Sequence, residues 1–201
     1  MNYKKLTDLE TASSSRLILA SASPRRKQIL ELAGFEVIVR GSSVDEKKLT
    51  GESPFDLVLR LSEKKALEAG PNPEGLATVG ADTVVVLDGE ILGKPRDILD
   101  ARKMLFALSG KVHEVITGYF IFTPKGAFRR RALSTQIAFR NLTEWDVENY
   151  LSLGEWADKA GSYAIQSGGG IFTKWINGSY TNIVGLPLAE FLIDFKEISL
   201  L

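Results

Sequence analysis

The chain has 201 residues, of which 44% are hydrophobic and 25% are charged, and its 25 basic residues balance its 25 acidic ones. This balance excludes a surface that binds nucleic acid polymers or membranes through bulk positive charge, and the absence of cysteine excludes disulfides and thiolate metal sites. No apolar stretch reaches the ~20 residues that span a bilayer, and residues 1–15 lack the apolar core of a signal peptide. We therefore expect a cytoplasmic protein with a flexible N-terminal extension over residues 1–15 and a single domain over residues 16–201.

Apolar runs alternate with helical patterns in the first half of the chain. Ser23 and Pro24 occupy positions typical of a helix start, and Asp88-Gly89 is a favoured hairpin turn. The pattern predicts strands at residues 17–20, 35–40, 76–87 and 90–95, and helices at residues 24–33, 54 to about 70, and 97–108.

The second half is richer in strands. Residues 112–122 and 128–139 are predicted to form a long hairpin, and residues 143–153 and 187–195 to form helices. Residues 161–185 are dense in glycine, which indicates a loop where the backbone closely approaches a ligand or another strand. The order of elements predicts one α/β domain with two lobes.

The segment from Leu17 to Arg26 is typical of a buried strand that runs directly into a helix. A helix start presents unpaired N–H groups, and the guanidiniums of Arg25 and Arg26 donate paired hydrogen bonds that suit phosphate oxygens. The sequence therefore predicts a phosphate site here, with Ser23 at the helix start. The alternative is an ordinary capped helix with both arginines on a solvated face.

Two carboxylates are candidates for metal binding: Glu46 follows a predicted strand, and Asp82 interrupts an apolar strand. A buried carboxylate costs free energy unless it is paired or binds a metal. Magnesium takes one or two carboxylates together with phosphate oxygens and water, so this pair complements the two arginines. The alternatives are a solvated charge at Glu46 and local hydrogen bonding to the backbone at Asp82.

Three further polar residues are candidates for contacts with a nucleotide. Lys65 and Lys94 can each supply a point charge to a polyphosphate, and the Gln166 amide can read a base edge. The alternatives are a solvated helix face for Lys65, a strand edge for Lys94 and loop hydrogen bonding for Gln166. His113, the only histidine, has no partner at metal-ligand spacing and is assigned a structural role.

Five segments occur in the order found in one known family, and they cover the chain from about Arg16 to Phe195. Through them the chain resembles the Maf family of nucleoside triphosphate pyrophosphatases, and the fourth is similar to the branch that acts on dTTP and UTP rather than on 7-methyl-GTP. Trp156 departs from the family, which commonly has proline there. The segments are LILASASPRRKQILELAGF, GADTVVVLDGEILGKPRD, LSGKVHEVITG, DKAGSYAIQ and GSYTNIVGLPL.

The resemblance implies a mixed twisted sheet flanked by helices, with two lobes and an active-site cleft between them, as in Maf and ITPase-like folds. It implies hydrolysis of dTTP, UTP and modified pyrimidine nucleotides to the monophosphate and pyrophosphate, a house-cleaning role in the nucleotide pool, and a homodimer as one expected assembly. It also implies site roles: Asp82 as proton acceptor, Glu46 and Asp82 as ligands of Mg, Mn or Co, and contacts with substrate from Ser23, Arg25, Arg26, Lys65, Thr83, Lys94 and Gln166. Arg25, Thr83 and Gln166 match the positions that select the base.

Three other functions stay open at this point. A 7-methyl-GTP pyrophosphatase would use the same chemistry on another base. A nucleotide sensor would need the phosphate site but not the joint presence of Glu46 and Asp82, and a phosphatase would release orthophosphate in place of pyrophosphate.

Overall fold

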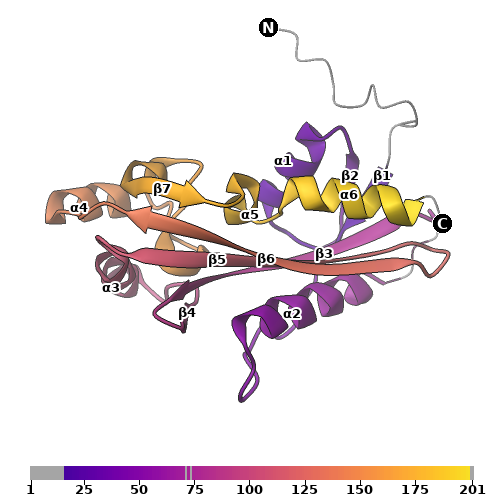
Figure 1. Cartoon of the computed structure of the whole chain (residues 1–201), viewed down its shortest axis with the longest axis horizontal. Coiled ribbons are helices and arrows are strands. Elements are labelled where there is room, and N and C mark those ends of the chain that lie inside the picture. The colour runs from indigo at the N-terminus through magenta and orange to yellow at the C-terminus, as the bar shows by residue number, and fades with distance from the viewer. Residues whose placement is uncertain (1–15, 71, 73, 200–201) are drawn as a thin grey trace, which may run out of the picture. The chain divides into compact units, whose positions relative to one another are not determined.

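A computed structural model describes residues 16–70, 72 and 74–199, so the predicted N-terminal extension lies outside the described residues. Within this part of the chain, seven strands form one sheet in the order β2-β1-β3-β5-β6-β7, with β4 paired to β3 (Figure 1). The pairs β1·β2 and β1·β3 are parallel, whereas β3·β4 and β6·β7 are antiparallel. The mixed α/β class predicted from the sequence is therefore confirmed.

The chain divides into two compact units, and the boundary between them falls inside β3, β5 and β6. Unit 1 holds the described residues up to Asp82, then Gly118–Ala132, then Gly185 onward; unit 2 holds Thr83–Thr117 and Leu133–Val184. The strands are β1 (Arg16–Leu19), β2 (Glu36–Val39), β3 (Ala77–Leu87), β4 (Glu90–Leu92), β5 (Val112–Phe122), β6 (Phe128–Phe139) and β7 (Thr173–Asn177).

In unit 1, helices cover both faces of the sheet. They are α1 (Pro24–Leu32), α2 (Pro54–Glu68) and α6 (Leu188–Ser199). On β5, Tyr119 packs edge-on against Phe191 of α6 at 5.8 Å between ring centroids, whereas its neighbour Gly118 faces Val58 of α2. Successive residues of a strand point to opposite faces, so α2 and α6 lie on opposite sides of the strands, as Figure 1 shows.

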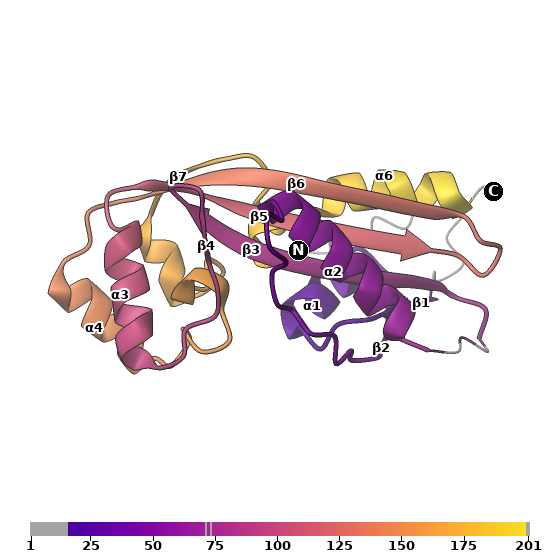
Figure 2. The ribbon, with the colours of Figure 1, turned by 90° about the horizontal axis from the view of Figure 1, so that it is seen from below.

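In unit 2, α3 (Ile98–Leu108) lies beside α4 (Glu144–Ser152), as seen in Figure 2. Arg102 on α3 forms ion pairs with Glu144 and Glu148 on α4. Thr143 begins α4 with a capping box, which confirms the predicted helix start. An aromatic cluster that includes Phe139, Tyr150, Tyr163 and Phe172 forms part of the core.

The prediction of a loop throughout residues 161–185 was wrong in part. This stretch contains η2 (Ala160–Ser162), η3 (Gly168–Phe172), the strand β7 and the short helix α5 (Tyr180–Val184). A five-residue edge strand and a five-residue helix have too little periodicity to register in a local pattern, and β7 forms by pairing with β6. The closing helix also runs further than predicted, to Ser199. No helix in the described chain has the length and apolar character needed to cross a membrane.

Candidate active site

The predicted phosphate segment forms a strand, a short connection and a helix. Helix α1 begins at Pro24 with Ser23 at the N-cap position, as predicted, but the Ser23 side chain makes no capping hydrogen bond. Instead, the Ser23 backbone N–H donates to Oγ of Ser21 at 3.3 Å. Ser21 therefore shapes the connection, a role that capping rules do not predict because they consider only the N-cap side chain.

Arg26 is buried, whereas Arg25 is half-buried. Only 9% of Arg26 is exposed, and its guanidinium donates from Nε to the Gly185 carbonyl and from Nη1 to Ser21 Oγ, each at 2.9 Å. Burial lowers the pKa of Arg26, while the nearby negative charge of Asp82 raises it. The solvated-face alternative is therefore wrong for Arg26. Two hydrogen bonds fix the orientation of its guanidinium, and the Asp82 carboxylate is near enough for its charge to affect the pKa of Arg26.

Lys65, Glu46 and Asp82 form the charged centre of unit 1. The Lys65 Nζ atom donates to Glu46 Oε1 and to Asp82 Oδ1, both at 2.6 Å. Lys65 and Asp82 are each only 7% exposed, whereas Glu46 is exposed. The alternative of a solvated helix face for Lys65 is therefore wrong, as is local backbone bonding for Asp82, which accepts a hydrogen bond from the Lys65 side chain on α2.

Close backbone contact explains why Lys65 reaches Asp82. At Gly80, two residues before Asp82 on the same face of β3, an added Cβ would lie 2.1 Å from the Ser62 carbonyl oxygen of α2. Only glycine allows the helix to lie this close to the strand. The next turn of α2 then places the Lys65 side chain over Asp82, because residues three apart on a helix share a face.

The environment favours a proton-accepting role for Asp82. Burial raises the pKa of the Asp82 carboxyl, and the positive charges of Lys65 and Arg26 oppose that rise. A raised pKa makes a carboxylate a better base near neutral pH than an ordinary aspartate. The positive charges of Lys65 and Arg26 offset part of the free-energy cost of burying the Asp82 carboxylate.

The donor set of unit 1 fits a divalent cation. Oxygens of Glu46 and Asp82 converge on the same cationic group, the Lys65 ammonium. Across the described residues, no group of three or more His, Cys, Asp and Glu side chains forms a metal site. Two carboxylates without a third protein ligand suit an ion such as magnesium, which completes its shell with substrate phosphate and water.

The remaining predicted residues lie in unit 2. The Thr83 hydroxyl is 2.9 Å from the Thr117 hydroxyl, whose own hydrogen is donated to the Asn182 carbonyl. Lys94 is exposed in the segment after β4. Gln166 is exposed and lies between the buried Ile165 and the exposed Ser167, and within the described chain its amide has no hydrogen-bond partner. The structure thus brings six predicted residues into unit 1 and the other three into unit 2.

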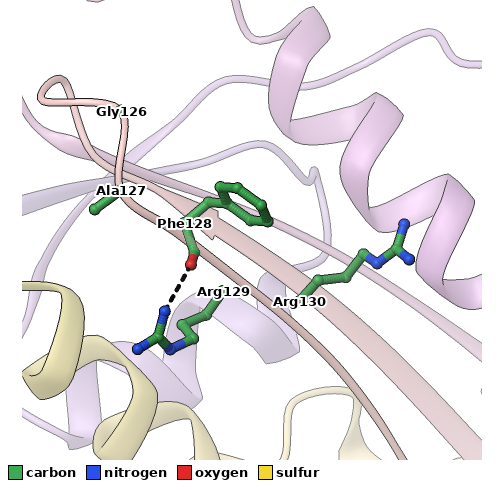
Figure 3. A pocket seen from close by; sticks show the side chains of 5 residues that line it. All are labelled: Gly126, Ala127, Phe128, Arg129 and Arg130. Carbon is green, nitrogen blue, oxygen red and sulfur yellow. Dashed lines mark hydrogen bonds between the residues drawn. The ribbon is translucent and has the colours of Figure 1, made fainter.

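Two other features contribute nothing to this site. His113 is 2% exposed and hydrogen-bonds Tyr163 at 2.8 Å, which confirms its structural role. A surface hollow of about 530 Å³ lies at the β5–β6 hairpin, where Figure 3 shows the Phe128 and Arg130 side chains on one side of the strand and Arg129 on the other. Its arginines are paired with carboxylates, Arg129 with Glu197 and Arg130 with Glu63.

A family model described as "Maf-like protein" matches residues 16–198, which include every residue of the candidate site. The chain belongs to the Maf family. Its relatives include the dTTP/UTP pyrophosphatase of Geobacter metallireducens, 45% identical over 189 residues, which are 94% of this chain and 98% of the relative. The dTTP/UTP pyrophosphatase of Pyrococcus abyssi is 49% identical to this Maf protein over 172 residues, which are 86% of this chain and 90% of the relative.

Among solved structures, a HAM1 protein from Coxiella burnetii is similar with a TM-score of 0.46 and 17% identity. The similarity covers 91% of this chain and 99% of that one.

Proposed function

We propose that this Maf protein is a nucleoside triphosphate pyrophosphatase that hydrolyses dTTP and UTP to the monophosphate and pyrophosphate. The observation that carries the proposal is the convergence of Glu46 and Asp82 on one cation, with the buried Arg26 beside them. A triphosphate brings about four negative charges, and enzymes that transfer phosphoryl groups bind it with fixed cations. The curated relatives named dTTP/UTP pyrophosphatase support this substrate class.

In the proposed reaction, the Asp82 carboxylate accepts a proton from water as the water oxygen attacks the α-phosphorus. The bond from the α-phosphorus to the oxygen that bridges to the β-phosphorus breaks, and its electron pair leaves with pyrophosphate. Arg26 and Lys65 supply positive charge for the departing phosphates from positions that the fold already fixes. Ser23 and Arg25 at the start of α1, with Lys94, are proposed to bind the rest of the triphosphate.

A divalent ion, Mg, Mn or Co, held by Glu46 and Asp82 would neutralise phosphate charge and lower the pKa of water. Arg25, Thr83 and Gln166 are proposed to select the base. The uracil and thymine edge offers a carbonyl acceptor beside an N–H donor, and one side-chain amide can satisfy both. Cytoplasmic localisation, a homodimer, action on modified pyrimidine nucleotides and a house-cleaning role stay predictions from the sequence.

Product analysis tests the proposal directly. The purified protein is incubated with UTP, dTTP, CTP and 7-methyl-GTP in the presence of magnesium, manganese or cobalt, and the products are separated by anion-exchange chromatography. We expect UMP or dTMP with an equal amount of pyrophosphate. Orthophosphate would indicate a phosphatase, binding without product would indicate a sensor, and preference for 7-methyl-GTP would overturn the pyrimidine assignment.

A further inference from the structure

The residue proposed to read the base stands on a tightly held turn. Ahead of Gln166, the residues Ala164 and Ile165 are buried, and the Ala164 N–H donates to the Tyr150 hydroxyl at 3.0 Å. Behind it, the Ser167 N–H donates to the Ala164 carbonyl at 3.2 Å. The backbone on both sides of Gln166 is therefore fixed, although its amide has no partner within the described residues.

One carboxylate holds the residues that follow Gln166. Oε2 of Glu155 accepts from the Ser167 hydroxyl at 2.8 Å and from the Gly168 N–H at 2.9 Å. Both donors are neutral and the acceptor is ionised, so these are charge-assisted hydrogen bonds and stronger than neutral ones. Glu155 is half-buried, and of the two bonds the one from the Gly168 N–H is partly shielded from water, whereas the one from Ser167 is exposed.

The turn also needs a glycine at its far end. A Cβ at Gly170 would lie 2.6 Å from the Ile165 carbonyl oxygen, the group that immediately precedes Gln166. This contact is with backbone, so a larger residue at position 170 would displace the Ile165–Gln166 peptide.

Trp156, the departure from the family pattern, supports the other side of this arrangement. Its indole Nε1–H donates to the Leu151 carbonyl in the last turn of α4 at 3.1 Å. Proline has no such donor. The indole therefore fixes the segment that carries Glu155 against the end of α4.

From these contacts we propose that Glu155 is a positioning residue for base selection: its carboxylate fixes the turn that presents Gln166 to the pyrimidine. This inference rests on the proposed function, because it assigns Gln166 to the base. Without the two hydrogen bonds, the turn is held by its remaining contacts to Ala164 and Ile165, so Gln166 samples more orientations, and binding the base has to restrict them at a cost in free energy. Glu155 acts only through Gln166 and touches no phosphate.

A double-mutant cycle tests this dependence. We expect Glu155→Ala to lower kcat/KM for UTP and dTTP about tenfold, mainly through KM, and Glu155→Gln to retain most activity because its amide oxygen accepts both hydrogen bonds. In a Gln166→Ala background, Glu155→Ala should have almost no further effect. Inhibition by inorganic triphosphate, which has no base, should be the same in all variants.

Glu148→Ala is the matched control, since Glu148 is an exposed glutamate in the middle of α4 and pairs with Arg102 of α3 rather than with the turn. It should behave as the wild type. If Glu155→Ala fails to fold, Ser167→Ala removes one of the two donors and should lower kcat/KM about threefold. Additive effects of the Glu155 and Gln166 changes, or weaker inhibition by triphosphate in Glu155→Ala, would overturn the proposal.

Hydrogen exchange separates this inference from the proposed function. Amides of residues 166–170 should exchange faster in Glu155→Ala than in Glu148→Ala, whether or not the protein hydrolyses a nucleotide. A wild type that cleaves neither UTP nor dTTP defeats the proposed function while the exchange result still tests the turn. Unchanged exchange shows that Glu155 does not hold the turn, and faster exchange with unchanged kcat/KM shows that the turn does not serve the base.

Discussion

The Nζ atom of Lys65 lies 2.6 Å from Oδ1 of Asp82, and both residues are buried in unit 1. A buried ion pair of this kind is costly to desolvate, so its presence alone is weak support for a stabilising role. Glu46 adds a second carboxylate to the same ammonium at 2.6 Å. These two carboxylates, which already face one cation, are the pair proposed to hold the divalent ion.

Asp82→Asn should abolish hydrolysis while nucleotide binding remains. The amide keeps the size of the side chain but loses the charge that accepts the proton, so turnover on UTP should fall at least ~100-fold. Pyrophosphate release measures turnover, and calorimetry with a non-hydrolysable UTP analogue measures binding. Asp88→Asn, in the exposed turn after β3, is the control and should remain active. Substantial turnover by Asp82→Asn would remove Asp82 from the catalytic role.

Arg26→Ala should impair both stability and activity. The change leaves the Gly185 carbonyl and the Ser21 hydroxyl without the donor that now lies 2.9 Å from each, and an unsatisfied buried polar group costs about 1–3 kcal/mol. Urea unfolding should therefore show a loss of about 2 kcal/mol or more. Lys27→Ala, which removes an exposed ion pair on the same helix, should change stability by less than about 0.5 kcal/mol. Equal stability of the two variants would contradict the assigned role of Arg26.

The burial of Arg26 could not be predicted from the sequence, although the elements around it could. The start of α1 at Pro24 and the strand that contains Asp82 follow from local signals, and both were predicted. Arg26 donates to the Gly185 carbonyl, 159 residues away in the sequence. Every residue has a backbone carbonyl, so residue types alone do not reveal this partner. Local rules consequently leave a solvated face open as an alternative for Arg26, whereas the folded chain buries its guanidinium.

In the candidate site, too, local sequence predicts which residues take part but not which contacts they make in the folded chain. Glu46, Lys65 and Asp82 were each predicted as site residues, but their common contact depends on the close approach of α2 to β3 at Gly80. Glu155 was missed altogether, because its partners are a serine hydroxyl and a backbone N–H rather than a charged group. An acidic residue next to an unexpected tryptophan was the one available signal.

Stability should depend on pH through His113. Burial lowers the pKa of His113 from 6.5 to about 4. Above pH 6.5 the imidazole is neutral in both states; below it, the unfolded chain binds a proton that the folded chain excludes until about pH 4. The free energy of unfolding should thus fall as pH decreases through this window, by about 3 kcal/mol in total.

His113→Gln isolates this contribution, because carboxylates also titrate toward pH 4. Urea unfolding at pH 7, 6 and 5 should show a smaller loss of stability in the variant than in the wild type. The glutamine can still hydrogen-bond the Tyr163 hydroxyl, the present partner of Nε2. Parallel pH profiles for the two proteins would show that His113 is not the group responsible.

Gln166→Glu should alter base selection more than catalysis. The exposed amide can donate to a base carbonyl, whereas the carboxylate only accepts and places negative charge against that carbonyl. A hydrogen bond lost in a desolvated site costs roughly 1–3 kcal/mol, which corresponds to ~5- to 150-fold in kcat/KM. Hydrolysis of UTP and dTTP should decrease by this factor, and hydrolysis of CTP by less, because its exocyclic amine can donate to the carboxylate. Gln136→Glu makes the same charge change at an exposed position on β6 and should leave all three rates unchanged. Equal losses for UTP, dTTP and CTP in Gln166→Glu would instead place Gln166 at the phosphates or in the fold.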